Sequence, residues 1–134
     1  KLLEVPPVNF EISYPTSRED FLANCCGFYN RQHNLLCLNG TLLMSEDVRW
    51  VEEQIYTIFH EMKHVRQYAA IEGLIDYDYS EELLRAWRYN SIVYIRPHES
   101  DEAYRKQAME NDAFGIEDYI RKLMTKENEF NESN

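Results

Sequence analysis

The chain of 134 residues carries 14 Lys and Arg against 24 Asp and Glu, a formal net charge of −10, and 44% of its residues are hydrophobic. This length and composition are typical of one globular domain that buries a core without metal or disulfide staples. Negative charge repels phosphate backbones, which argues against nucleic acid as a partner. No apolar run approaches the ~18 residues of a membrane span, so we expect no membrane partner either.

The three cysteines, Cys25, Cys26 and Cys37, are odd in number, and two of them are adjacent. Adjacent cysteines form strained disulfides, so this set is not typical of a secreted disulfide framework. His33 with these cysteines fits no finger spacing, and we expect inert, buried thiols. The cysteine usage predicts a cytoplasmic protein.

The N-terminal third predicts little regular structure. Residues 1–17 contain three prolines and predict an irregular arm, and residues 18–24 suit a short helix. Asn39-Gly40 lies between two apolar runs, which is a strong signal for a β-hairpin turning there. One strand followed by a loop is the alternative.

A long amphipathic helix follows, and it is the best-defined element of the sequence. Ser45 suits the N-cap, because Glu46 and Asp47 then lie in the first turn. Gly73 suits the end of the helix, which we place at about residues 70–73. Its apolar residues recur at helical spacing: Val48, Val51, Ile55, Ile58, Phe59, Met62 and Val65.

Two further helices are expected downstream. Ser80 can cap a second helix, and Pro97 suits the first turn of a third helix that reaches about residue 124. The second carries Leu83, Leu84 and Trp87 on one face, and the third carries Met109, Ala113, Ile116, Ile120 and Leu123. The polar residues 125–134 predict a frayed tail. We therefore expect one α+β domain over residues 1–134, with a small β-hairpin or sheet packed on the long helix and two further helices.

The run His60-Glu61-Met62-Lys63-His64 is an H-E-x-x-H motif inside the long helix. Residues four apart share a helical face, so both imidazoles point the same way and supply half of a tetrahedral zinc site. Glu61 is rotated about 100° from His60, where it can take a proton from water at the metal. The motif predicts His60 and His64 as metal ligands and Glu61 as general base.

A third ligand is needed, and the helix after Pro97 offers the candidates. Extending its apolar stripe backwards from Met109 in steps of three and four places Glu102 and Glu99 on the inward face. A carboxylate on an inward face is costly unless it is paired or bound to metal. We expect Glu99 as the ligand, with Glu102 as the alternative and His98 as an outsider.

The motif at residues 60–64, the following Val65-Arg66-Gln67, and Arg96-Pro97-His98-Glu99 before a helix resemble the small zincin metallopeptidases. The closest likeness is to the minimal gluzincin-like proteins, H-E-x-x-H plus a downstream Glu, common in bacteria and their mobile elements; it covers about residues 27–124. The resemblance implies a Zn²⁺ cofactor and a peptide or protein substrate. It also implies a strand over the zinc cleft, matched by Leu35–Leu38, that aligns peptide by edge pairing. Related sequences often place Ala three residues after the ligand Glu, but here Glu102 holds that position and Ala103 follows.

Peptide hydrolysis also needs a group that stabilises the oxyanion, and zincins often use Tyr, His or Arg. Tyr68 lies one turn after His64, and Tyr94 and His98 precede Glu99; Tyr89 is a further candidate. Gln67 can hydrogen-bond a metal ligand from outside. Packing in the core is the competing role for each tyrosine.

Three interpretations of the function remain open on the sequence. The first is a zinc-dependent peptidase that hydrolyses peptide bonds with metal-activated water and Glu61 as base. The alternative is a zincin-fold, zinc-binding regulatory or interaction module without turnover, which the small size favours. A helical module with an accidental motif is a third interpretation.

Overall fold

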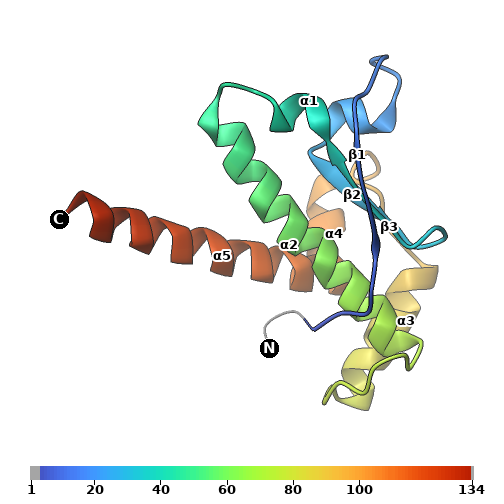
Figure 1. Cartoon of the computed structure of the whole chain (residues 1–134). Coiled ribbons are helices and arrows are strands. Elements are labelled where there is room, and N and C mark those ends of the chain that lie inside the picture. Colours follow the sequence, from blue (N-terminus) through green and yellow to red (C-terminus); the bar gives the residue numbers. More distant parts are fainter. Residues whose placement is uncertain (1–3, 134) are drawn as a thin grey trace.

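The computed structural model describes residues 4–133, and these form an α+β fold with a small sheet on one side of a set of helices (Figure 1). The α+β class predicted from the sequence is confirmed. The first three residues of the expected arm and the last residue of the tail lie outside the described part. The elements are β1 (Asn9–Ser13), η1 (Phe21–Asn24), β2 (Gly27–Asn30), β3 (Leu35–Asn39), α1 (Gly40–Leu43), α2 (Val48–Ile71), α3 (Glu81–Ile92), α4 (Asp101–Lys106) and α5 (Ala108–Glu132).

The sheet has the strand order β1-β3-β2, so β3 lies in the middle. β1 runs parallel to β3, and β2 runs antiparallel to it. The expected irregular arm therefore contains a strand, because residues 9–13 find a partner more than twenty residues away, a pairing that local sequence does not reveal. The expected short helix over residues 18–24 is present as the 3-10 helix η1.

The hairpin forms, but not at Asn39-Gly40. Its turn is residues 31–34, where Asn34 takes the left-handed conformation with φ 48°. Asn39 instead ends β3 and caps α1, since its Oδ1 accepts the Leu42 amide at 3.2 Å. Asn is favoured both in tight turns and at helix N-caps, and Asn39 takes the N-cap position rather than the predicted turn position.

α2 is the long helix that the apolar stripe predicts. It begins at Val48, two residues later than the start expected from an N-cap at Ser45. The N-cap is Asp47, whose side chain accepts the Arg49 amide at 3.0 Å. Its end at Ile71 and the positive φ of Gly73 (70°) agree with the expected stop. Ser80 caps α3 as expected, accepting the Leu83 amide at 3.1 Å.

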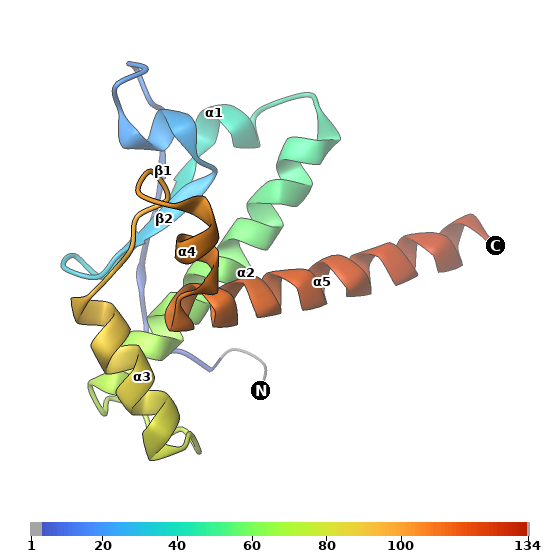
Figure 2. The ribbon, with the colours of Figure 1, turned by 180° about the vertical axis from the view of Figure 1, so that it is seen from behind.

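α5 packs across α2, and the two helices diverge toward the C-terminus (Figure 2). Met109, Ala113 and Ile120 are buried on the inward stripe, and Met109 joins Trp87 and Ala70 in the core. The expected frayed tail is wrong for residues 125–132, which continue α5. Among the described residues, no helix has both the length and the apolar character needed to cross a membrane.

The predicted third helix is two helices, because the chain breaks at Gln107, whose backbone is extended (φ −64°, ψ 150°). The Gln107 side chain accepts from Asn90 Nδ2 at 2.8 Å and from the Ile95 amide at 3.0 Å, and donates to the Ile95 carbonyl at 2.8 Å. Asn90 Oδ1 in turn accepts the Met109 amide at 2.8 Å, one of the first amides of α5 that no helical carbonyl can satisfy. This buried network holds α4 and α5 as separate helices.

Two buried glutamines on α2 should respond oppositely to substitution. Gln54 is 1% exposed and its amide oxygen and nitrogen have no hydrogen-bond partner, whereas the equally buried Gln67 has partners on both atoms. An unpaired buried amide costs about 1–3 kcal/mol. We expect Gln54→Met to raise the free energy of unfolding by about that amount and Gln67→Met to lower it, as measured by urea denaturation. A loss of stability in both variants would contradict this.

Candidate metal centre

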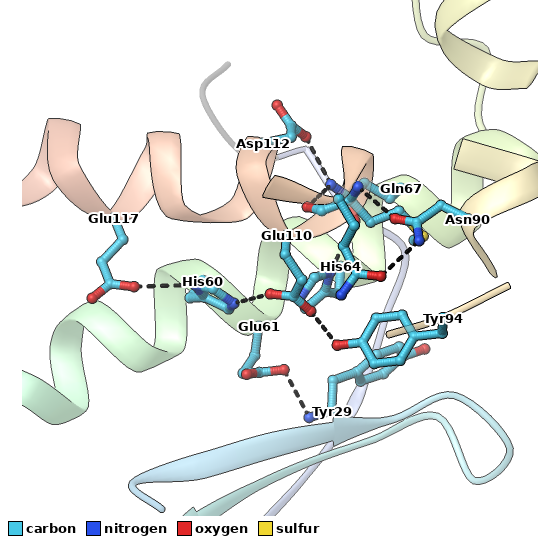
Figure 3. A network of polar contacts seen from close by, with 12 residues as sticks. Tyr29, His60, Glu61, His64, Gln67, Asn90, Tyr94, Glu110, Asp112 and Glu117 are labelled. Carbon is cyan, nitrogen blue, oxygen red and sulfur yellow. Dashed lines mark hydrogen bonds and ion pairs between the residues drawn. The ribbon is translucent and has the colours of Figure 1, made fainter. Parts of the chain in front are cut away.

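His60 and His64 lie one turn apart on α2 and both face Glu110 at the start of α5 (Figure 3). His60 Nε2 is 3.0 Å from Glu110 Oε2, and His64 Nε2 is 3.1 Å from Glu110 Oε1. The three side chains are 8%, 12% and 2% exposed. One ligand atom from each residue lies within 4.8 Å of the others, so this buried His–His–Glu group could hold a metal ion.

Outer partners fix the orientation of both imidazoles. His60 Nδ1 donates to Glu117 Oε2 at 3.1 Å, and His64 Nδ1 donates to Gln67 Oε1 at 2.9 Å. Gln67 is itself held, because its amide nitrogen donates to the Met109 carbonyl at 2.9 Å and to Asp112 at 2.8 Å. With each Nδ1 engaged, each Nε2 is left to point at Glu110, the arrangement that presents imidazole to a metal.

The carboxylates around the two histidines favour positive charge at this point. Burial alone would lower the pKa of His60, but its bonds to Glu110 and Glu117 outweigh burial and raise it to about 10. The pKa of His64 is also raised, since its bond to Glu110 outweighs burial. Burial would raise the pKa of Glu110, but both imidazoles lower it well below its usual range.

The donor set fits a divalent cation. To donate to Glu110 through Nε2, both imidazoles must carry a second proton, and these two positive charges lie against the carboxylates of Glu110 and Glu117, with Glu61 beside them. A zinc ion would supply the same charge with neutral imidazoles. Tetrahedral zinc keeps its ligand atoms roughly 3.4 Å apart, from bonds of about 2.0–2.2 Å. In the structure the two imidazole nitrogens lie 3.0 and 3.1 Å from different oxygens of Glu110, and one ligand atom from each residue lies within 4.8 Å of the others, so the three side chains would adjust around the ion.

Glu61 lies beside this group and points to the sheet. Its Oε2 accepts the Tyr29 amide of β2 at 3.0 Å (Figure 3). Gly27 lets β2 come this close, because a Cβ there would lie 2.6 Å from the Cys37 carbonyl oxygen and 3.3 Å from the Thr57 methyl group on α2. Burial raises the pKa of Glu61, and the two histidines lower it less than burial raises it. A carboxyl with a raised pKa is suited to accept a proton.

Tyrosines close the opposite side of the group. The Tyr94 hydroxyl donates to Glu110 Oε1 at 2.5 Å, and burial together with that contact raises its pKa. The Tyr104 ring of α4 lies 6.2 Å from the rings of Tyr94 and Phe114. Burial raises the pKa of Tyr104 too, so both hydroxyls keep their protons and remain donors.

A cleft of about 650 Å³ opens over these residues. Its walls come from β2 with the preceding loop, from α2, from the loop before α4, and from α4 and α5. The lining includes the three possible ligands together with Glu61, Tyr94 and Tyr104. A buried polar group at the wall of such a cleft is the usual setting of a ligand or active site.

The structure does not bring Glu99 or Glu102 to the histidines. Glu99 is exposed in the turn before α4 and accepts the Arg96 amide at 3.1 Å. Glu102 is 76% exposed and pairs with Lys106. Glu110 takes the expected place instead. The stripe counted backwards from Met109 crosses the break at Gln107, so its phase is lost before α4.

The other candidates divide into two groups. Tyr94, Gln67 and Tyr68 lie at the site: the first two bond to Glu110 and His64, and Tyr68 lines the cleft. His98 is exposed and outside the lining, and Tyr89 is 67% exposed on α3.

Glu110 and Glu117 were missed, although the sequence contains a signal for them. Glu110, Ala113, Glu117 and Ile120 recur at spacings of three, four and three, so both acids lie on the core-facing stripe of the helix. Carboxylates there need partners. An inward-facing carboxylate does meet the histidines, but it is Glu110 of α5 rather than Glu99 or Glu102.

The expectations for the cysteines and the cleft strand meet mixed outcomes. Cys37 is buried as expected, but Cys25 and Cys26 are only half-buried and line the cleft. Burial raises the pKa of Cys25 to about 11, which suits an unreactive thiol. Leu35–Leu38, expected as the strand that pairs with substrate, belongs to β3 and has partners on both edges. The strand with a free edge at the cleft is β2, whose Tyr29 amide points away from β3 to Glu61.

Comparison of the chain with protein-family models, curated proteins and solved structures finds no match. The fold and the site therefore define the class by themselves: an α+β protein with a buried His–His–Glu group, suited to a metal ion, at the wall of a cleft.

Proposed function

We propose that the protein is a zinc-dependent peptidase of zincin-like architecture. One observation carries the proposal: two histidines from an H-E-x-x-H helix and a glutamate from another helix converge in a buried group, with Glu61 and an open cleft beside them. A purely structural ion pair would need neither the cleft nor the extra carboxylate at its edge.

His60, His64 and Glu110 would hold the metal. When bound, zinc would supply a Lewis acid that lowers the pKa of water toward ~7. Glu61 would accept the proton of the attacking water and later return it to the leaving amine. Its contact with the Tyr29 amide keeps its carboxylate at the edge of the cleft rather than in bulk solvent.

Donors around the cleft support acyl chemistry. The Tyr94 hydroxyl contacts Glu110 and lines the cleft, so it would be a candidate donor to an oxyanion formed beside the metal. The free edge of β2 offers backbone groups to an extended peptide. Peptide or protein is therefore the substrate class that the cleft suits best.

The experiment is a zinc titration followed by a peptide-cleavage screen. After chelation and dialysis the protein is expected to bind one zinc ion per chain, measured by native mass spectrometry. The loaded protein should cleave members of a mixed peptide library, chelation should stop cleavage, and added zinc should restore it.

Each outcome bears on a different part of the proposal. No zinc binding by the folded protein would overturn it entirely. Stoichiometric zinc without cleavage of any peptide would reject the peptidase and leave a zinc-binding regulatory module. Cleavage that survives chelation would assign the activity to a contaminant or to other residues.

A further inference from the structure

α5 carries a second apolar stripe beside its inward face, from residue 116 to residue 130. Leu123, expected on the inward face, belongs to this exposed stripe instead, and Ile116 is half-buried at its edge. Ile116, Tyr119, Leu123 and Phe130 fall within about 60° of the helix circumference, at 3.6 residues per turn. Tyr119, Leu123 and Phe130 are 49%, 45% and 70% exposed, whereas Ile120 on the inward face is 7% exposed. Ile116, Leu123 and Phe130 are seven residues apart, which is the period of a coiled-coil seam.

This part of the helix extends beyond the rest of the fold. Figures 1 and 2 both show the end of α5 projecting past α2. Near this end Arg121 pairs with Glu53 of α2 at 2.8 Å, and most of the residues from 122 to 132 are exposed. Residues 122–132 make about three helical turns, and an isolated helix shorter than about 12–15 residues is marginal in water. Packing against another surface would stabilise it.

The charges beside the stripe indicate which kind of surface could pack against it. Lys122 and Glu129 lie on the same flank, one heptad apart. If a second α5 lies antiparallel, Lys122 of each copy faces Glu129 of the other, which gives two opposite-charge pairs by symmetry. A parallel, in-register pair would instead place Lys122 of each copy opposite Glu127 of the other, so the two orientations predict different responses to charge reversal at Glu129.

The antiparallel arrangement also matches shape. It places Phe130 of one copy beside Tyr119 and Ile116 of the other. A shallow hollow of about 430 Å³ lies there, lined by Lys63, Asn111, Asp112, Gly115, Ile116 and Tyr119. A Cβ on Gly115 would meet nothing within 4 Å, so the hollow is open at that point.

We propose that the exposed stripe of α5 is the interface of an antiparallel homodimer, with a second copy of this chain as its occupant. The stripe from residue 116 to residue 130 is about 21 Å long, so the interface is small and the dimer weak. Its aromatic residues serve as anchors, and the Lys122–Glu129 pairs set the orientation. This inference does not depend on the metal or on any activity.

The test uses charge reversal on the full-length protein, read by sedimentation velocity from ~1 to ~200 μM, a range that covers weak interfaces. Wild type should pass from monomer to dimer over this range. Lys122→Glu and Glu129→Lys should each weaken dimerisation at least about tenfold, because each creates two like-charge pairs. The double variant should dimerise like wild type, and an equimolar mixture of the two single variants should form a mixed dimer.

Glu132→Lys is the matched control, since it makes the same charge change away from the seam and should leave dimerisation unchanged. A parallel dimer would respond to Lys122→Glu but not to Glu129→Lys, because Lys122 would then face Glu127. A wild type that stays monomeric at every concentration would overturn the proposal. So would a dimer that persists in both single variants, or a double variant that stays monomeric.

Discussion

Glu61→Gln is expected to lower the rate of peptide hydrolysis by about 10²–10⁴-fold while the protein still binds one zinc ion, because the amide keeps the shape of the side chain but cannot accept a proton. The Tyr29 amide donates to Glu61 Oε2 in the structure, and the amide oxygen of glutamine can accept the same bond. The fold and the position of β2 should therefore be preserved. The measurement pairs steady-state cleavage of a library peptide with zinc stoichiometry on the same sample.

The role of Glu61 is tested by comparing two effects of Glu61→Gln, its effect on the cleavage rate and its effect on zinc binding. Tyr68→Phe is a suitable control, since Tyr68 also lines the cleft but contacts Tyr29 and Arg31 rather than the metal group. It should change the rate much less than Glu61→Gln. Full activity in Glu61→Gln would remove Glu61 from the mechanism. Loss of zinc together with activity would show that it acts through the site's structure instead.

Glu110→Gln is expected to weaken zinc binding at least about a hundredfold, because the carboxylate is the anionic member of the group and contacts both imidazoles. Removing an outer hydrogen-bond partner of a metal ligand typically costs 10–100-fold, and losing a direct ligand should cost more. Glu117→Gln, which alters the partner of His60, should fall in that smaller range. Competition with a chromophoric chelator measures the zinc affinity of the wild type, Glu110→Gln and Glu117→Gln.

Glu99→Gln and Glu102→Gln separate this site from the one that sequence periodicity predicts. Both acids are remote from the histidines in the structure and should leave zinc affinity within about twofold of wild type, since substitutions at a distance from a site are nearly neutral. If Glu99→Gln releases zinc and Glu110→Gln does not, the assignment of the third ligand is reversed. Circular dichroism confirms that each variant is folded.

The elements predicted correctly are those whose signal is local. The apolar stripe of α2, its stop near Gly73 and the Ser80 cap of α3 each depend on residues within a few positions of one another. The placement of His60 and His64 on one face follows from the same helical period. Because the α-helix is built from contacts three and four residues apart, such patterns survive folding unchanged.

The parts that failed depend on contacts between distant segments. β1 pairs with β3 across more than twenty residues, so residues 9–13 appear irregular until the sheet is assembled. The extension of α5 through residues 125–132 is a different case, because this end of the helix projects beyond α2 (Figure 1) and still contradicts the fraying predicted from its polar composition. Neither outcome has a marker of its own in the local sequence.

The sequence alone therefore determined the helix, the two imidazoles that share one of its faces, and the carboxylate of Glu61 between them. Only the tertiary structure decided which acid joins them. Gln107 breaks the helix through bonds to Asn90 and Ile95, residues twelve or more positions away, and the break changes which face of the following turns points inward. Periodicity carries information only along an unbroken helix. Glu110, the first acid after the break, reaches the histidines because α5 packs across α2 at that point.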